Sequence, residues 1–175
     1  LKSDGSVVTW GSSSYGGDSS SISNNLTSDV TKIYSTGRAF AALKSDGSVV
    51  TWGGSIYGGD SSSVASDLAS NVIQISSTDR AFAALKSDGS VVTWGSSSST
   101  SFWDYGGDSS SVSSQMTSGV TNIYSNKQAF AALKSDGSVV TWGSSSRGGD
   151  SSEVSLDLKS DVISFANPLT DDWIS

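Results

Sequence analysis

The sequence predicts an all-β protein built from repeated antiparallel units, and three observations lead to that prediction. A fifteen-residue stretch, AFAALKSDGSVVTWG, occurs three times without a change, at 39–53, 81–95 and 129–143. A tryptophan recurs every 42 residues, with one interval lengthened to 48, at Trp10, Trp52, Trp94 and Trp142. Each copy also places β-branched or aromatic residues on both sides of Asp-Gly, which is a strong hairpin signal.

The repeats make the whole chain, residues 1–175, a single array. Each unit is expected to run as a first strand (VTKIYS in the first complete unit), a variable link, a second strand AFAAL, the turn KSDGS, a third strand VVTWG and a serine-rich return. The last segment matches the start of the first complete unit in register, so it can complete the partial first unit. The predicted units are 1–29 (partial), 30–71, 72–119, 120–161 and 162–175 (partial).

The aspartates of the Asp-Gly pairs are interpreted as turn formers. Asp bonds its own backbone in a turn and Gly tolerates a positive φ. Each Asp stands alone between Ser and Gly, without the closely spaced oxygen ligands that calcium prefers, so no metal site is predicted. The residues concerned are Asp4, Asp46, Asp88 and Asp136.

The tryptophan row is interpreted as core packed between neighbouring sheets, because a Trp placed once per unit beside Gly is typical of such packing. In the return, apolar residues stand four apart, as at Ile22 and Leu26, after an aspartate that can cap a helical turn. The return is therefore expected to contain one helical turn, with a fourth outer strand as the alternative. The capping candidates are Asp18, Asp60, Asp108 and Asp150.

Composition excludes several classes of function. The chain is 35% hydrophobic with six Trp, enough for a core, and its net charge of −7 disfavours nucleic acid as a partner. No apolar run is long enough to cross a membrane, so no membrane insertion is expected. With neither Cys nor His there is no thiolate and no Ser-His-Asp triad. The adjacent pair Asp171 and Asp172 would point to opposite faces of a strand, so it is a poor candidate for the paired carboxylates of glycoside cleavage. A non-enzymatic protein without cofactors is therefore predicted.

The repeat resembles the units of the regulator of chromosome condensation family. Those units read as a hydrophobic strand, then A-L-x-x-D-G-x-V, then W-G-x-x-x-x-G, and the resemblance extends over essentially the whole chain. Two departures stand out: Thr36, Thr78 and Asn126 occupy a position that is usually Gly, and GGDS replaces G-Q-L-G. The matching positions in the first complete unit are Leu43, Asp46, Gly47, Val49, Trp52, Gly53 and Gly58.

This resemblance implies a β-propeller whose blades are antiparallel units of about 42 residues, either four blades or a fragment of a larger ring. An elongated β-solenoid is the alternative. The family includes an exchange factor for a small GTPase and a bacterial propeller that inhibits β-lactamases, both of which act through protein contacts. The resemblance therefore implies binding rather than catalysis.

Differences between the repeats indicate where a partner would bind. The first and third strands run in the same direction, so the link after the first strand and the loop after Trp-Gly emerge at the same end, and these are the variable segments. Their side chains are of the types enriched at binding hot spots. The alternatives are that these segments vary neutrally, with the tyrosines packed between blades, and that the six inserted residues Ser99 to Asp104 fold over a blade. The predicted ligand-binding residues are Arg38, Arg80, Lys127, Arg147, Tyr15, Tyr57, Tyr105, Phe102 and Trp103.

The function predicted is that of a non-enzymatic binding or structural module in a secreted or surface protein of a bacterium, contacting a protein or a glycan. An inhibitor propeller acting on another protein is the second reading, and a polysaccharide-active enzyme is the third. The expected location is extracellular or at the cell surface.

Overall fold

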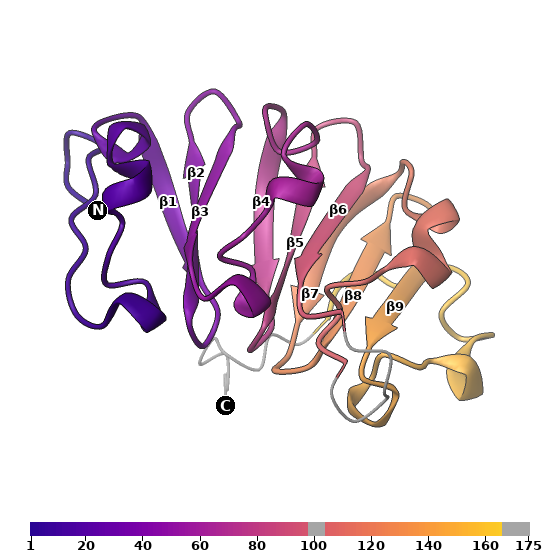
Figure 1. Cartoon of the computed structure of the whole chain (residues 1–175). Helices are drawn as coiled ribbons and strands as arrows, with labels where there is room; N and C mark the ends of the chain where they lie inside the picture. The colour runs from indigo at the N-terminus through magenta and orange to yellow at the C-terminus, as the bar shows by residue number, and fades with distance from the viewer. Residues whose placement is uncertain (98–103, 166–175) are drawn as a thin grey trace, which may run out of the picture.

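Three antiparallel sheets of three strands each, lying side by side, form the protein (Figure 1). The structure is a computed structural model that describes residues 1–97 and 104–165. Each sheet has its strands in chain order. They are β1 (Val30–Ser35), β2 (Ala39–Lys44) and β3 (Val49–Gly53); β4 (Val72–Ser77), β5 (Ala81–Lys86) and β6 (Val91–Gly95); and β7 (Val120–Ser125), β8 (Ala129–Lys134) and β9 (Val139–Gly143).

The three strands predicted for each complete unit are confirmed, with the second strand one residue longer than AFAAL. Identical sequences give identical registers: Phe40 pairs with Trp52 as Phe82 pairs with Trp94 and Phe130 with Trp142. The first strand of every sheet has a register shift after its opening valine. The 42-residue period is therefore a structural period as well.

The hairpin turn follows from the Asp-Gly pair, as predicted. In the first sheet the Gly47 amide donates to the Lys44 carbonyl at 3.0 Å and the Lys44 amide donates to the Ser48 carbonyl at 2.9 Å. Gly47 has a φ of 78°, the left-handed conformation that closes a type I turn into a bulged hairpin. The Asp46 carboxylate accepts from the Ser48 amide at 2.9 Å and from its hydroxyl at 2.6 Å, so Asp46 is a turn former.

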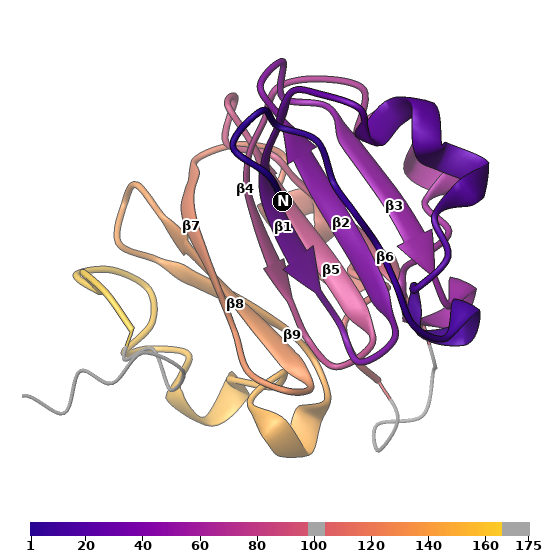
Figure 2. The ribbon, with the colours of Figure 1, turned by 90° about the vertical axis from the view of Figure 1, so that its left-hand side faces the viewer.

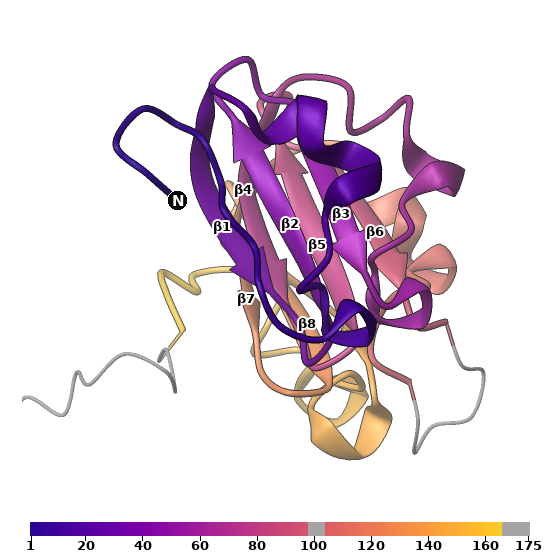
Figure 3. The ribbon, with the colours of Figure 1, turned by 60° about the vertical axis from the view of Figure 1, so that its left-hand side comes forward.

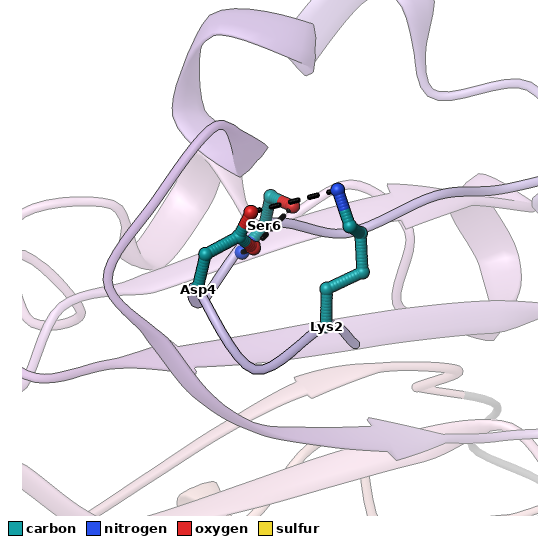
Figure 4. A network of polar contacts seen from close by, with 3 residues as sticks. All are labelled: Lys2, Asp4 and Ser6. Carbon is teal, nitrogen blue, oxygen red and sulfur yellow. Dashed lines mark hydrogen bonds and ion pairs between the residues drawn. The ribbon is translucent and has the colours of Figure 1, made fainter.

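The same bonds lower the pKa of the turn aspartates. The Ser6 hydroxyl, then its amide, and then the charge of Lys2 hold the pKa of Asp4 at about 2, and Lys2 Nζ lies 3.5 Å from the Asp4 carboxylate (Figure 4). In the other three turns, hydrogen bonds from the serine two residues after the aspartate lower the pKa of its carboxyl in the same way. These aspartates are Asp46, Asp88 and Asp136.

Stability is therefore expected to fall in acid. A carboxyl whose folded pKa lies below its unfolded value stabilises the fold above that unfolded value, about 3.9, and loses the contribution as the pH falls toward the folded pKa. The melting temperature should decline between about pH 4 and pH 2, and the decline should be smaller in a variant carrying Asp46→Asn and Asp88→Asn. A parallel decline in both proteins, followed by circular dichroism, would contradict this account.

The sheets are arranged as propeller blades. The first strands of successive sheets lie side by side, and the third strand of each sheet is the one farthest from these first strands (Figure 2). Side chains bridge the inner strands: the Ser77 hydroxyl donates to the Ser35 carbonyl, and the Ser125 hydroxyl to the Ser77 carbonyl, both at 2.8 Å. In the described residues no strand of one sheet pairs with a strand of another. The all-β propeller architecture is thus confirmed over three complete blades, and the β-solenoid alternative, which needs ladders between successive repeats, is wrong.

The core lies between blades, where the predicted tryptophan row is buried in three of its four positions. Trp94 is 3% exposed, stacks on Phe82 with ring centroids 5.2 Å apart, and donates from Nε1 to the Gly58 carbonyl of the preceding unit at 3.0 Å. Trp52 and Trp142 repeat this arrangement with Gly16 and Gly106.

Trp10 is the exception, and the core prediction was wrong for it. It is 83% exposed, although its sequence context, VVTWG, is the same. Within the described residues no strand pairs with residues 7–11 and no carbonyl accepts from the indole of Trp10. Figures 1 and 3 show this N-terminal segment as irregular chain beside the first sheet.

The serine-rich returns contain 3-10 helices, so the predicted helical turn is confirmed and the fourth strand is absent from the described units. In the first return, Asp18 accepts from the Ser20 amide at 2.9 Å, and Leu26 at the end of the helix is buried. The helices of the returns are η2 (Ser20–Leu26), η4 (Ser62–Val64), η5 (Ser110–Gln115) and η7 (Ser152–Val154). Three-residue helices also follow Trp-Gly pairs, at η1 (Ser13–Tyr15), η3 (Ser55–Tyr57) and η6 (Ser145–Arg147).

Completion of the first unit by residues 162–175 stays a prediction, because 166–175 lie outside the described residues. No helix in the described part of the chain has the length and apolar character needed to span a membrane.

Candidate functional site

The links after the first strands and the loops after Trp-Gly meet at one end of the blades, the lower end in Figure 1. In the first blade the Gly54 amide donates to the Arg38 carbonyl at 2.8 Å, and the Thr36 hydroxyl donates to the Tyr57 carbonyl at 2.9 Å. The invariant KSDGS turns lie at the opposite end. The links and the loops after Trp-Gly, which differ between repeats, therefore share one end of the molecule.

Five of the predicted residues form an alternating stack, which we call the Arg–Tyr row. The Arg38 guanidinium carbon lies 4.7 Å from the ring centroid of Tyr15 and 5.1 Å from that of Tyr57. The Arg80 guanidinium carbon lies 5.0 Å from the Tyr57 centroid and 4.8 Å from that of Tyr105. These are cation–π distances, so each arginine lies between tyrosines from two successive loops.

The backbone around the row is fixed by hydrogen bonds that recur from blade to blade. Thr78 donates to the Tyr105 carbonyl at 2.8 Å, as Thr36 does to Tyr57, so a threonine of the link holds the tyrosine loop in each of the first two blades. Neighbouring links are joined as well: the Gly37 amide donates to the Asp79 carbonyl and the Asp79 amide to the Lys127 carbonyl, both at 2.9 Å. Hydrogen bonds thus anchor the backbone of the links and loops that carry the row.

The alternation stops at the third blade. Gln128 stands where the first two blades have arginine, and Arg147 stands where they have tyrosine. Asn126 replaces the threonine and donates from its side-chain amide to the Arg147 carbonyl at 2.8 Å. A surface hollow of about 460 Å³ opens here, which we call the third-blade hollow. It is lined by Asp79, Asn126, Lys127, Gln128 and Arg147.

This end of the molecule is rich in cations although the chain is acidic. All three arginines of the sequence lie here, together with Lys127. Within residues 1–97 and 104–165 no carboxylate lies at ion-pair distance from Arg38, Lys127 or Arg147. These side chains are exposed, whereas the tyrosines range from Tyr15, 50% exposed, to Tyr105, 4% exposed.

The predicted residues thus fall into three groups. The structure brings Tyr15, Arg38, Tyr57, Arg80 and Tyr105 into the row and places Lys127 and Arg147 in the hollow beside it. Phe102 and Trp103 lie outside the described residues. Asn126 and Gln128 of the hollow were not predicted, although aligning the three links would have shown that both differ from their counterparts.

A second hollow, which the sequence did not predict, lies along the inner strands. It measures about 550 Å³ and is lined mainly by residues of β1, β4, β7 and β8. The Gln74 side-chain amide and the Ser76 hydroxyl both donate to the Ile123 carbonyl, at 2.8 and 2.9 Å. Partial burial raises the pKa of the Tyr34 phenol at its edge. These polar groups bond one another, which indicates packing between blades.

No family model and no curated protein matches the chain. Among solved structures, human WBSCR16 is similar at 21% identity over 67% of this chain and 35% of that one, with a TM-score of 0.42. Yeast RCC1 (Prp20), solved with Kap60 bound to it, is similar at 16% identity over 65% of this chain and 29% of that one, with a TM-score of 0.44. The ectodomain of the Physcomitrella patens receptor kinase CR4 is similar at 14% identity over 81% of this chain and 34% of that one, with a TM-score of 0.48. The chain spans about a third of the length of each, and likenesses of this extent identify neither a partner nor an activity.

Proposed function

We propose that the chain is a non-enzymatic repeat module that binds a macromolecular partner, a protein or a glycan, through the Arg–Tyr row and the third-blade hollow. One observation carries the proposal: arginine side chains from the links and tyrosine side chains from the loops after Trp-Gly stack in a row at one end of the blades. Residues of these types dominate the binding energy of known interfaces. We propose a secreted or surface bacterial protein as the setting of the module.

The row has the physical properties of a binding surface. Arginine loses much conformational freedom when it is held by a partner, and each ordered side chain costs about 0.5–1.5 kcal/mol on association. Here the flanking tyrosine rings already hold the guanidinium of Arg38 in place before a partner arrives. A non-catalytic role is supported by chemistry: the chain has no His and no Cys, so it lacks the commonest general base and the thiolate nucleophile.

The proposal is tested by presenting the whole chain to a peptide array and to a glycan array. Wild type should bind members of at least one array, and a variant with Arg38→Gln and Arg80→Gln should lose that binding. A variant with Lys32→Gln and Lys44→Gln removes two charges on the strands away from the row and should bind as wild type does. Equal loss in both variants would reduce the effect to net charge, and an absence of any binding by the wild type would refute the proposal.

A further inference from the structure

We infer that residues 1–29, which we call the open unit, are an acceptor site for the first and second strands of a repeat unit, supplied as one extended segment. This interaction surface goes beyond the proposed function and does not depend on it. Three features carry the inference: the open unit is already held in place, an apolar hollow lies beside it, and the repeats specify the strand that fits.

The open unit is held by the same bonds as its counterparts in the complete units. The Val7 amide donates to the Leu26 carbonyl at 2.9 Å. The Thr9 and Ser19 hydroxyls lie 2.8 Å apart. The corresponding bonds in the first complete unit both measure 2.9 Å. Residues 7–11 are therefore anchored as a third strand is, and a partner does not have to order them first.

What residues 7–11 lack is a strand beside them. The third strand of each sheet pairs with a second strand, whereas no strand in the described part of the chain pairs with residues 7–11. Val8 is 61% exposed and Trp10 is 83% exposed. Large apolar side chains gathered at the surface mark interaction sites. A mainly apolar hollow of about 280 Å³ lies here, between the open unit and the first blade, and its lining includes Val7, Trp10, Phe40 and Trp52.

The repeats specify the strand that fits this hollow. In each sheet the phenylalanine of AFAA pairs with the tryptophan of the third strand, and the two rings stack with their centroids 5.1 to 5.3 Å apart. Applied to the open unit, this register places a phenylalanine opposite Trp10 and an alanine opposite Val8. A larger residue would overpack the second position, because Ala42, its counterpart opposite Val50, is fully buried. The leucine that follows AFAA in the repeat corresponds to Leu1, so the occupant is an extended segment that ends in Ala-Phe-Ala-Ala.

Residues 162–175 are the rival occupant. The prediction that they complete the first unit uses the same register, which would place Asp172 opposite Trp10. A carboxylate in an apolar hollow loses its hydration and gains no partner there. A phenylalanine at that position buries apolar surface instead, so we expect the segment with AFAA to bind in preference.

The test adds a labelled peptide with the sequence of residues 30–42, VTKIYSTGRAFAA, to the full chain and measures fluorescence anisotropy. Binding should weaken at least about tenfold with Trp10→Ala, because the stack of two aromatic rings and the area that they bury are lost. Leu156→Ala is the control. It removes an apolar side chain that is 75% exposed in the last return, and it should leave binding unchanged.

Further measurements decide between the occupants. A peptide with Ser in place of the phenylalanine and a peptide with the sequence of residues 162–174 should each bind at least about tenfold more weakly. Amide hydrogen exchange of residues 7–11 should slow when the 30–42 peptide is bound, because the added strand pairs with them.

The inference fails if the 30–42 peptide does not bind, if its binding is unaffected by Trp10→Ala, or if exchange at residues 7–11 is unchanged. It also fails if the Ser peptide binds equally well or the 162–174 peptide binds more tightly. Dimers of the free chain that Trp10→Ala dissociates, measured by sedimentation, would overturn it as well, because the hollow would then be an interface between copies of the chain.

Discussion

Trp94→Ala should lower the free energy of unfolding by about 3–5 kcal/mol, whereas Trp10→Ala should change it by less than about 0.5 kcal/mol. Both residues occupy the sequence VVTWG, so local propensity is the same. Trp94 is 3% exposed, is stacked on Phe82 and donates to the Gly58 carbonyl, while Trp10 is 83% exposed. The substitution at position 94 leaves a cavity and an unsatisfied carbonyl; the one at position 10 removes exposed surface.

Urea unfolding followed by circular dichroism measures both variants against the wild type. Equal destabilisation by the two substitutions would mean that Trp10 is packed in solution, and no effect at either position would remove the interblade core from this account. Trp52→Ala serves as a replicate, because Trp52 has the same stacking and the same bond to a glycine carbonyl.

The strands and turns were predictable from the sequence because they depend on short-range pairing. AFAAL and VVTWG are joined by a turn whose Asp-Gly pair fixes the geometry, so Asp46, Gly47 and their counterparts determine the hairpin wherever the sequence recurs. The environment of Trp10 was not predictable in this way. Burial of a tryptophan depends on a second strand beside it and on a loop 36 residues earlier, as Trp94 depends on Gly58.

The candidate site was predictable in position but not in pairing. The directions of the first and third strands predict that the links and the loops after Trp-Gly lie at one end, and the predicted ligand-binding residues belong to these segments. The intercalation of Arg38 between Tyr15 and Tyr57 depends on the offset between neighbouring blades, which the sequence does not encode locally. The third-blade hollow is lined by Asn126, Gln128 and Arg147, which stand where the first two blades have threonine, arginine and tyrosine. The stacking of arginine and tyrosine in the first two blades has to be known before the meaning of these differences can be recognised.

The glycine after each loop tests how the loop of one blade packs on the next. Gly58 has a φ of 92° and Gly148 a φ of 95°, so alanine at either position costs about 1–2 kcal/mol in the left-handed region. The surroundings differ. A Cβ at Gly58 would lie 2.6 Å from the Phe82 ring, whereas at Gly148 its nearest neighbour among the described residues would be the Asn126 side-chain amide at 3.9 Å.

Gly58→Ala should therefore be more destabilising than Gly148→Ala by about 1–3 kcal/mol, the usual range for overpacking a filled core. Because the backbone term is common to both variants, the difference between their unfolding free energies isolates the contact with Phe82. Gly58→Ala should cost less in a Phe82→Leu background than in the wild type, since leucine lacks the ring atoms that the new methyl group would meet. Equal effects of Gly58→Ala and Gly148→Ala, or an equal cost of Gly58→Ala in the wild type and in the Phe82→Leu background, would show that the loop does not pack on the following blade. The positions assigned to Tyr57 and the row would then lose their support.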